Sequence, residues 1–126
     1  MIFGIGTDIV RIERMQHGLD RYGDKFAERI LSAEEFSEFK KTETGARFLA
    51  KRFAAKEATA KAMGTGFRDG LSLKHIFVGH DEKGKPILNY TQQASTFMEE
   101  NNISESHISL ADEQEYAVAF VTLLKG

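Results

Sequence analysis

The feature that most constrains this chain is one long segment without helix breakers. No proline or glycine follows Gly45 until Gly64, and the residues between them are rich in alanine, arginine and lysine, which favour helices. We therefore expect a helix over 44–63 that ends at Gly64. A helix of this length buries its apolar side against other elements, so it is predicted to form the spine of the fold.

Shorter elements are expected on both sides of this helix. Alternating apolar residues and turn signals predict strands over 2–6, with Asp8 at or near its end, and over 71–78, 85–88, 107–110 and 116–124. Helical patterns cover 12–31 with interruptions at Gly18 and Gly23, 33–41 behind a capping box of Ser32 and Glu35, and 90–101. The order predicts an α+β fold in which residues 1–126 form a single domain, with the long central helix packed on a mainly antiparallel sheet.

Composition excludes several classes of protein. The chain has 126 residues and no cysteine, which removes disulfides, thiolate nucleophiles and Cys-based zinc sites. Its net charge of −2 argues against a general nucleic-acid binder, which must neutralise many phosphates. The N-terminal MIFGIGTDIV lacks the basic lead-in and long apolar run of a signal peptide or membrane span. We expect a cytoplasmic protein that binds neither nucleic acid nor membrane.

The two halves of the chain carry opposite charge. Residues 11–61 have a net charge of +3, whereas residues 62–126 have a net charge of −4. A basic first half would orient the molecule toward an acidic partner, but solvated helical faces also show such imbalance by chance. Charge alone does not decide between these two interpretations.

Glu57 has an unusual place on the long helix. At about 100° per residue, it lies at the centre of an apolar face of mostly small residues, the kind of face that packs against a sheet. The other members of this face, all within about 60° of it, are Ala46, Ala50, Phe53, Ala54, Ala60, Lys61 and Gly64. A carboxylate at that place costs several kcal/mol in desolvation unless it is paired.

Two interpretations of Glu57 remain open. In the first, Glu57 pairs with Lys61, because oppositely charged residues at i and i+4 of a helix often pair. Alternatively, it is a metal ligand beside a phosphate-binding Lys61, with Asp8 as the second carboxylate. Mg²⁺ suits such a pair, because it takes few protein ligands and completes its shell with water and phosphate. Asp8 by itself is also typical of a turn residue after a strand.

The remaining polar signals are weaker. The sequence Gly64-Thr65-Gly66 is typical of helix termination, whereas a phosphate cradle favours a helix N-terminus. His107 begins a predicted strand, where a structural role and an anion contact are both open. The histidines include no pair at zinc spacing and belong to no serine–histidine–aspartate order.

Three segments together indicate a family. They are GIGTDIV at 4–10, RFLAKRFAAKEATAKAMGTG at 47–66 and GKPIL at 84–88. On these segments the chain closely resembles the holo-[acyl carrier protein] synthases, small bacterial 4′-phosphopantetheinyl transferases, over essentially its whole length. The closing HISLADEQEYAVAFV matches the family's last two strands, except that Ala111-Asp112 stands where some members have serine and histidine.

The resemblance implies a set of site residues. Asp8 and Glu57 match the family's magnesium ligands, and Lys61 matches the lysine associated with the coenzyme A phosphates. We expect Glu57 and Lys61 to be the catalytic residues. The positions that match contacts with coenzyme A are Arg52, Lys61, Gly64, Thr65, Pro86 and His107. The role of the family's second closing histidine does not carry over to Asp112. Members of this size form homotrimers with active sites at the subunit boundaries.

The implied reaction transfers 4′-phosphopantetheine from coenzyme A to a serine of apo-acyl carrier protein, releases adenosine 3′,5′-bisphosphate and supports fatty acid biosynthesis. Mg²⁺ and Lys61 would neutralise charge on the pyrophosphate oxygens. The general base is open between Glu57 acting through a metal-bound water and Lys61 in a transiently neutral form.

The family also implies a protein partner for the early basic helix. Acyl carrier proteins are acidic, which would explain the charge split, and the docking candidates are Arg14, Arg21, Lys25 and Arg29, with Met15 as an apolar contact. Two functions of other classes remain as alternatives. One is a non-catalytic module that binds carrier proteins or nucleotides, and the other is a Mg²⁺-dependent nucleotide pyrophosphohydrolase in which water replaces the serine.

Overall fold

Helices and strands alternate irregularly along the chain, and the computed structural model describes all residues from Met1 to Gly126. The elements are β1 (Ile2–Arg11), α1 (Ile12–Tyr22), α2 (Asp24–Ile30), α3 (Ala33–Phe39), α4 (Gly45–Met63), the 3₁₀ turn η1 (Leu73–His75), β2 (Ile76–His80), β3 (Pro86–Tyr90), α5 (Gln92–Glu100), β4 (Ile103–Asp112) and β5 (Tyr116–Lys125). Strands β1, β5 and β4 form one sheet in that order, and β2 and β3 form a second. All pairs are antiparallel, so the expected α+β class is confirmed.

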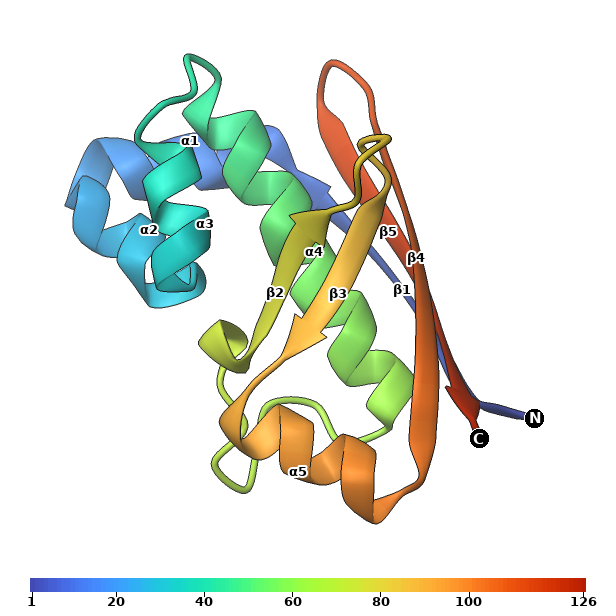
Figure 1. Cartoon of the computed structure of the whole chain (residues 1–126). Coiled ribbons are helices and arrows are strands. Elements are labelled where there is room, and N and C mark those ends of the chain that lie inside the picture. Colours follow the sequence, from blue (N-terminus) through green and yellow to red (C-terminus); the bar gives the residue numbers. More distant parts are fainter.

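Helix α4 is the spine of the molecule, as predicted. It runs between the three-stranded sheet and the β2–β3 hairpin, with α1–α3 at one end and α5 at the other (Figure 1). Its residues are buried on almost every side, within one cluster of 25 buried apolar residues. Gly64 ends it with a φ of 83°, a left-handed conformation that favours glycine. None of the helices combines the length and the hydropathy that crossing a membrane requires.

Strand β1 lies directly against α4 because it has glycine at the contact. A Cβ on Gly4 would overlap the carbonyl oxygen of Ala62, and a Cβ on Gly6 would overlap that of Ala58. Small residues on both elements therefore let the two backbones approach closely. Because side chains alternate along a strand, Asp8 follows Gly4 and Gly6 on the face toward α4.

Two strands are longer than the sequence predicts. Strand β1 continues to Arg11, so Asp8 lies within it, paired with Ala119, and neither at its end nor in a turn. Strand β4 begins at Ile103, which places His107 in mid-strand. In both cases the pairing with β5 extends the strand through polar residues such as Asp8 and Glu105, since tertiary context outweighs strand propensity.

Other boundaries differ for local reasons. Gly18 does not interrupt α1; it lies beneath the ring of Phe26, where a Cβ would clash. The predicted break occurs only at Gly23, which has a φ of 63°. Residues 71–75, expected in a strand, form a loop and η1. The capping box of α3 forms as predicted, and the first position of β3 is proline, which donates no hydrogen bond there.

The side of the three-stranded sheet that faces away from α4 is uncovered and carries exposed apolar side chains among polar ones. Ile5, Ile9 and Phe120 are exposed there by 59%, 63% and 46%. The strand register brings them together. Phe120 lies opposite Thr7, the residue of β1 between Ile5 and Ile9 on the same face. A contiguous exposed apolar surface of this kind marks a contact surface. It is named the outer sheet face below.

Candidate functional site

Asp8 and Lys61 meet across the contact between β1 and α4. The Nζ of Lys61 lies 2.9 Å from Oδ1 of Asp8 and donates to the carbonyl oxygen of Thr7 at 3.0 Å. The Asp8 side chain is 14% exposed, whereas that of Lys61 is 55% exposed. The ammonium group thus lies between a largely buried carboxylate and solvent. The pair between Lys61 and Glu57, one of the two interpretations of the sequence, is not formed, because Lys61 turns toward Asp8 on β1 instead.

Glu57 completes an acidic cluster with Asp8. Burial, and then the negative charge of Asp8, raises the pKa of the Glu57 carboxyl, while the cations Lys61 and Arg14 oppose the rise. Arg14 approaches from α1, where its guanidinium stacks over the ring of Phe53 at 5.2 Å. The two carboxylates therefore repel each other in a partly desolvated place, and a further cation between them would relieve the repulsion.

The donor set of this cluster fits Mg²⁺. The chain nowhere assembles three or more His, Cys, Asp or Glu side chains as a metal-binding group, which is the number a protein zinc site uses. Mg²⁺ commonly takes one or two carboxylates together with water and substrate phosphates. The raised pKa of Glu57 shows that the protein's own cations do not fully compensate its ionised form. The pair therefore suits a divalent cation accompanied by a phosphate ligand.

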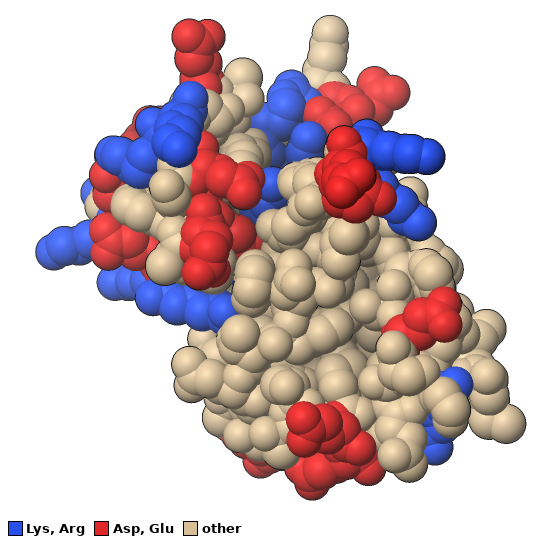
Figure 2. Space-filling model, viewed as in Figure 1, with Lys and Arg blue, Asp and Glu red and all other residues tan.

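A second polar region is a basic cleft of about 350 Å³ between α4 and the tips of the two hairpins. It is lined by Thr42, Thr44, Arg47, Phe48, Lys51, Arg52, His80, Gly84, Pro86 and Leu110. Arg52 and Pro86, two predicted contacts of coenzyme A, thus come together although they are distant in sequence. Most Lys and Arg side chains of this face lie in the upper part of the view, among acidic ones, while the opposite end carries a patch of acidic side chains (Figure 2).

Arg52 reaches the basic cleft from a buried position. Its guanidinium stacks over Phe48 at 4.3 Å and lies 3.8 Å from Glu35 and 3.4 Å from Glu38. Burial lowers the pKa of Arg52, and the two glutamates oppose that effect. Its Nε has no hydrogen-bond partner within the protein. That Nε faces Glu35 and not the cleft, so Arg52 contributes to the cleft a cation fixed by buried partners.

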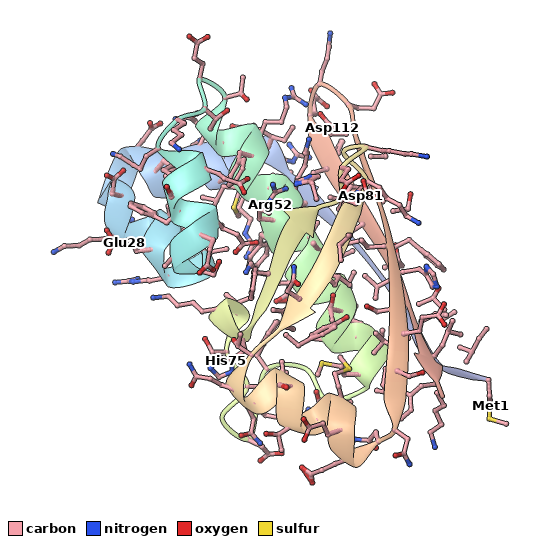
Figure 3. All side chains as sticks on the ribbon, viewed as in Figure 1. Met1, Glu28, Arg52, His75, Asp81 and Asp112 are labelled. Carbon is pink, nitrogen blue, oxygen red and sulfur yellow. The ribbon has the colours of Figure 1, made fainter.

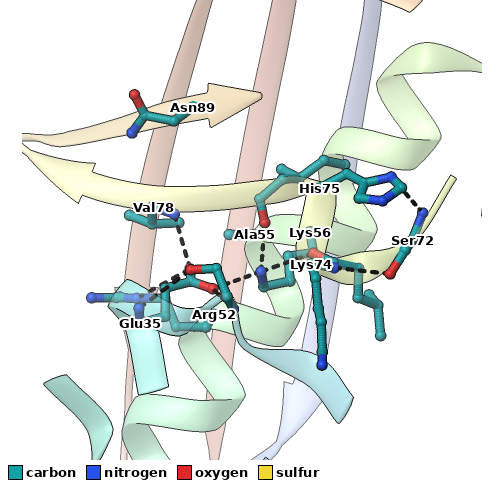
Figure 4. Close-up of polar contacts among 12 residues, drawn as sticks. Glu35, Arg52, Ala55, Lys56, Ser72, Lys74, His75, Val78 and Asn89 are labelled. Carbon is teal, nitrogen blue, oxygen red and sulfur yellow. Dashed lines mark hydrogen bonds and ion pairs between the residues drawn. The ribbon is translucent and has the colours of Figure 1, made fainter. Parts of the chain in front are cut away.

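Glu35 and Lys56 form the centre of a buried network that the sequence did not reveal (Figure 4). The Nζ of Lys56 donates to Glu35 at 2.7 Å and to the carbonyl oxygens of Leu73 and Ile76, and Glu35 accepts from the N–H of Val78 at 2.9 Å. Burial lowers the pKa of Lys56, while Glu35 opposes the shift. The network fixes α3, α4 and β2 around Arg52. Its partners come from separate elements, so no local spacing indicates it.

The predicted docking side chains are exposed on α1 and α2. They are Arg14, Arg21, Lys25 and Arg29. Met15, however, is only 1% exposed and belongs to the core, so the expectation that it contacts a partner is wrong. The physical reason is the apolar stripe of α1, in which Met15 faces α4 together with Leu19.

Tyr22 is an exposed apolar side chain among these basic residues of α1 and α2. It is 49% exposed, and the guanidinium groups of Arg21 and Arg29 lie over its ring at 5.4 Å and 5.8 Å. Sequence reasoning missed Tyr22, although its place at the end of the basic helix was visible. A flat apolar ring between two cations suits contact with an acidic protein surface.

Three predicted positions lie outside these groups. Gly64 follows Lys61 by about one helical turn and caps α4, while Thr65 lines a separate pocket with Arg68. His107 is 52% exposed and pairs with Glu105 at 2.7 Å. It projects from the outer sheet face, away from Asp8, since its register partner Thr122 alternates with the buried residues of β5. One copy of the chain does not bring His107 to the acidic cluster.

Comparisons with known proteins agree on one family. The family model described as the 4′-phosphopantetheinyl transferase superfamily matches residues 4–121. The chain is 55% identical to the holo-[acyl-carrier-protein] synthase of Nitrosococcus oceani over 124 residues, which are 98% of this chain and 80% of that protein.

Solved structures of the same kind match closely. The crystal structure of holo-[acyl-carrier-protein] synthase from Neisseria meningitidis has a TM-score of 0.94 and 46% identity, covering 99% of this chain and 100% of that one. The Bacillus anthracis holo-(acyl-carrier-protein) synthase in complex with CoA (3′,5′-ADP) has a TM-score of 0.84 and 38% identity, covering 100% and 99%.

Proposed function

The chain belongs to the 4′-phosphopantetheinyl transferase superfamily, and we propose that Asp8, Glu57 and Lys61 form its reaction centre. Like the relatives described above, it is an enzyme that transfers 4′-phosphopantetheine from coenzyme A to apo-acyl carrier protein. The observation that carries the proposed centre is the meeting of two carboxylates and one ammonium group at the contact between β1 and α4.

The reaction is a phosphoryl transfer. The serine oxygen of the carrier protein attacks the pantetheine-side phosphorus, and the bond from this phosphorus to the bridging oxygen breaks. Adenosine 3′,5′-bisphosphate leaves with the electron pair, and the serine loses its proton. Because negative charge builds on the pyrophosphate oxygens, catalysis depends on position and on nearby cations.

Asp8 and Glu57 are the proposed holders of Mg²⁺, and Lys61 is the proposed contact with the pyrophosphate. When bound, Mg²⁺ supplies positive charge that polarises the phosphate oxygens. Asp8 orients the ammonium of Lys61 at 2.9 Å, and the exposure of Lys61 leaves its remaining donor free for a phosphate oxygen. Asp8 would thereby be a ligand of Mg²⁺ and the ion-pair partner of Lys61.

Glu57 is also the proposed acceptor of the serine proton, through a bridging water. Burial and Asp8 raise the pKa of Glu57 in the metal-free protein, whereas a bound cation would lower it, so the carboxylate would be ionised and able to accept a proton. Lys61 is a weaker candidate, because its ammonium group is paired with Asp8 and has no lone pair to accept a proton.

The basic cleft is the proposed site for phosphate groups of coenzyme A. Arg47, Lys51 and Arg52 supply its positive charge, and Pro86 lies on its wall. The lining of the cleft supports this assignment, because two arginines and one lysine meet there and phosphate binds such cations. Gly64, Thr65 and His107 remain proposed contacts of coenzyme A in the assembled enzyme.

A homotrimer with sites at the subunit boundaries is proposed for the assembly. The outer sheet face, with Ile5, Ile9 and Phe120 exposed, supports it, since contact with other copies would remove these side chains from water. His107 projects from that face and would therefore approach the site of a neighbouring copy.

The exposed basic side chains of α1 and α2 are the proposed docking surface for the acidic carrier protein. Arg14, Arg21, Lys25 and Arg29 would attract it, and Tyr22 replaces Met15 as the apolar contact. A cytoplasmic location and a role in fatty acid biosynthesis complete the proposal.

A transfer assay tests the function directly. Apo-acyl carrier protein is incubated with coenzyme A, the enzyme and Mg²⁺, with and without a chelator, and its intact mass is measured. We expect a gain of one phosphopantetheine group that requires the metal. Free phosphopantetheine with unmodified carrier protein would indicate a pyrophosphohydrolase instead, and binding without turnover would indicate a binding module.

A further inference from the structure

Asp112 forms ion pairs with two of the cations that line the basic cleft. Its Oδ2 lies 2.8 Å from the guanidinium of Arg47, and its Oδ1 lies 3.8 Å from the Nζ of Lys51. Figure 3 shows Asp112 toward the tip of the β4–β5 hairpin. All three side chains of this group are about two-thirds buried, at 30% to 34% exposure. An acidic side chain therefore stands where the cleft would otherwise present free positive charge.

The position of Arg47 does not depend on the charge of Asp112. Arg47 also donates to the carbonyl oxygen of Glu113 at 2.6 Å and to that of Gln114 at 3.4 Å. The hairpin tip has an independent anchor, because the N–H of Ile12 donates to the carbonyl oxygen of Glu115 at 2.8 Å. Removal of the Asp112 charge would thus leave the hairpin and Arg47 in place.

The three cations of the cleft differ in their partners. Arg52 is compensated by the buried Glu35 and by Glu38, which is half exposed. Arg47 and Lys51 have Asp112 as their only carboxylate partner. A phosphate entering the cleft has to share or displace this one carboxylate to reach both cations, and like charges close together repel.

We propose that Asp112 is an internal competitor that weakens the binding of phosphate groups in the basic cleft. In the free enzyme Asp112 pairs with Arg47 and Lys51, and these ion pairs break when a phosphate group of coenzyme A binds to the two cations. The same competition limits how tightly adenosine 3′,5′-bisphosphate is retained, which favours release of this product. The inference rests on the proposed role of the basic cleft in binding coenzyme A.

The test compares Asp112→Asn with Glu113→Gln. Glu113 is the next acidic residue of the same hairpin, and its side chain forms no ion pair, so it controls for the change in net charge. Calorimetry measures the Kd of coenzyme A and of adenosine 3′,5′-bisphosphate at low salt, and steady-state kinetics measure the KM of coenzyme A. Asp112→Asn is expected to lower these constants by about two- to fivefold, the range of partly exposed ion pairs. The gain should shrink at high salt, which screens such charges.

A second variant links the gain to Arg47. In an Arg47→Gln background, Asp112→Asn should lower the Kd less than it does alone, because one of the two cations it would release is absent. The inference is overturned if Asp112→Asn leaves the Kd unchanged or raises it, or if Glu113→Gln gives an equal gain. A fall in thermal stability that accompanies weaker binding would assign Asp112 a structural role instead. Phosphopantetheine transfer by the wild-type enzyme tests the proposed function separately, so the two can fail independently.

Discussion

The Nζ of Lys61 lies 2.9 Å from Oδ1 of Asp8, so a single ion pair links helix α4 to strand β1 at the proposed reaction centre. Asp8 is fixed by the sheet and is mostly buried, whereas Lys61 is more than half exposed. The carboxylate therefore positions the ammonium group rather than the reverse. This arrangement makes Lys61 a cation with a defined direction, which is what stabilising a developing phosphate charge requires.

Replacing Lys61 by methionine should remove that cation with little change in volume. We expect kcat/KM for coenzyme A to fall about 100-fold or more, the effect of removing one preorganised charge stabiliser. Lys74→Met, which changes an exposed lysine on η1, is the matched control. Steady-state transfer kinetics measure both variants, and a Lys61→Met enzyme within twofold of wild type would contradict the assignment.

Glu57→Gln should abolish metal-dependent transfer and yet stabilise the metal-free protein. Burial and Asp8 raise the pKa of Glu57 in the folded state above its ordinary value of 4.5. The folded protein thus binds this proton more tightly than the unfolded chain, and stability falls as the pH rises from 4.5 through the folded-state pKa. Glutamine carries no charge at any pH and removes this loss.

Thermal unfolding with a chelator at pH 5 and pH 8 checks the Glu57→Gln prediction. The variant should have the higher Tm at pH 8, and the difference should be smaller at pH 5. Added Mg²⁺ should stabilise the wild type but not the variant, because a ligand of the folded state stabilises it by mass action. Retained metal-dependent transfer in Glu57→Gln would mean that the carboxylate has only a structural role.

Local sequence signals were sufficient for the spine and for the choice of Glu57. The helix α4 follows from the absence of breakers before Gly64, and the apolar surroundings of Glu57 follow from helical periodicity. Both are properties of neighbouring residues. The burial of Met15 could also have been predicted from the sequence, because Ile12, Met15 and Leu19 recur at helical spacing and form an apolar stripe on α1.

Contacts between distant segments could not be predicted from such local patterns. Lys56 appears on a helix with many lysines, and only the fold brings it to Glu35 and the carbonyl oxygens near β2. Likewise, the partner of Lys61 is Asp8, which lies 53 residues earlier, and not Glu57 on its own helix. The choice among charged partners depends on how elements pack, which periodicity within one element does not determine.

Charge reversal on the docking surface should affect one substrate more than the other. We expect Arg14→Glu with Arg21→Glu to raise the KM for the carrier protein about tenfold or more while changing the KM for coenzyme A much less, because repulsion acts on the acidic partner. The single variant Arg21→Glu keeps Arg14 beside Glu57 and should show the same selectivity. Lys125→Glu, which changes an exposed lysine at the end of β5, is the control. An equal rise in both KM values would contradict the docking assignment.

The outer sheet face should control assembly. Phe120→Asp places a charge at its centre, where burial against another copy would cost several kcal/mol, but in the monomer the side chain stays exposed. We expect a folded monomer with little transfer activity, measured by analytical ultracentrifugation and by the mass assay. Ile87→Asp alters an exposed apolar residue on β3 and should leave the assembly intact. A Phe120→Asp protein with wild-type assembly would contradict the prediction.

Tyr90 should make stability depend on alkaline pH. Burial raises the pKa of Tyr90 from its ordinary value of 10.0 to about 12, with a smaller opposing effect of Ser106. The folded protein keeps this proton longer than the unfolded chain, so the free energy of unfolding should fall between pH 10 and pH 12, by about 2–3 kcal/mol. Tyr90→Phe lacks the ionisation and should show a shallower fall in denaturant titrations, whereas Tyr22→Phe, which changes an exposed ring, should follow the wild type. Identical pH profiles for wild type and Tyr90→Phe would show that the phenol ionises without opposing the fold.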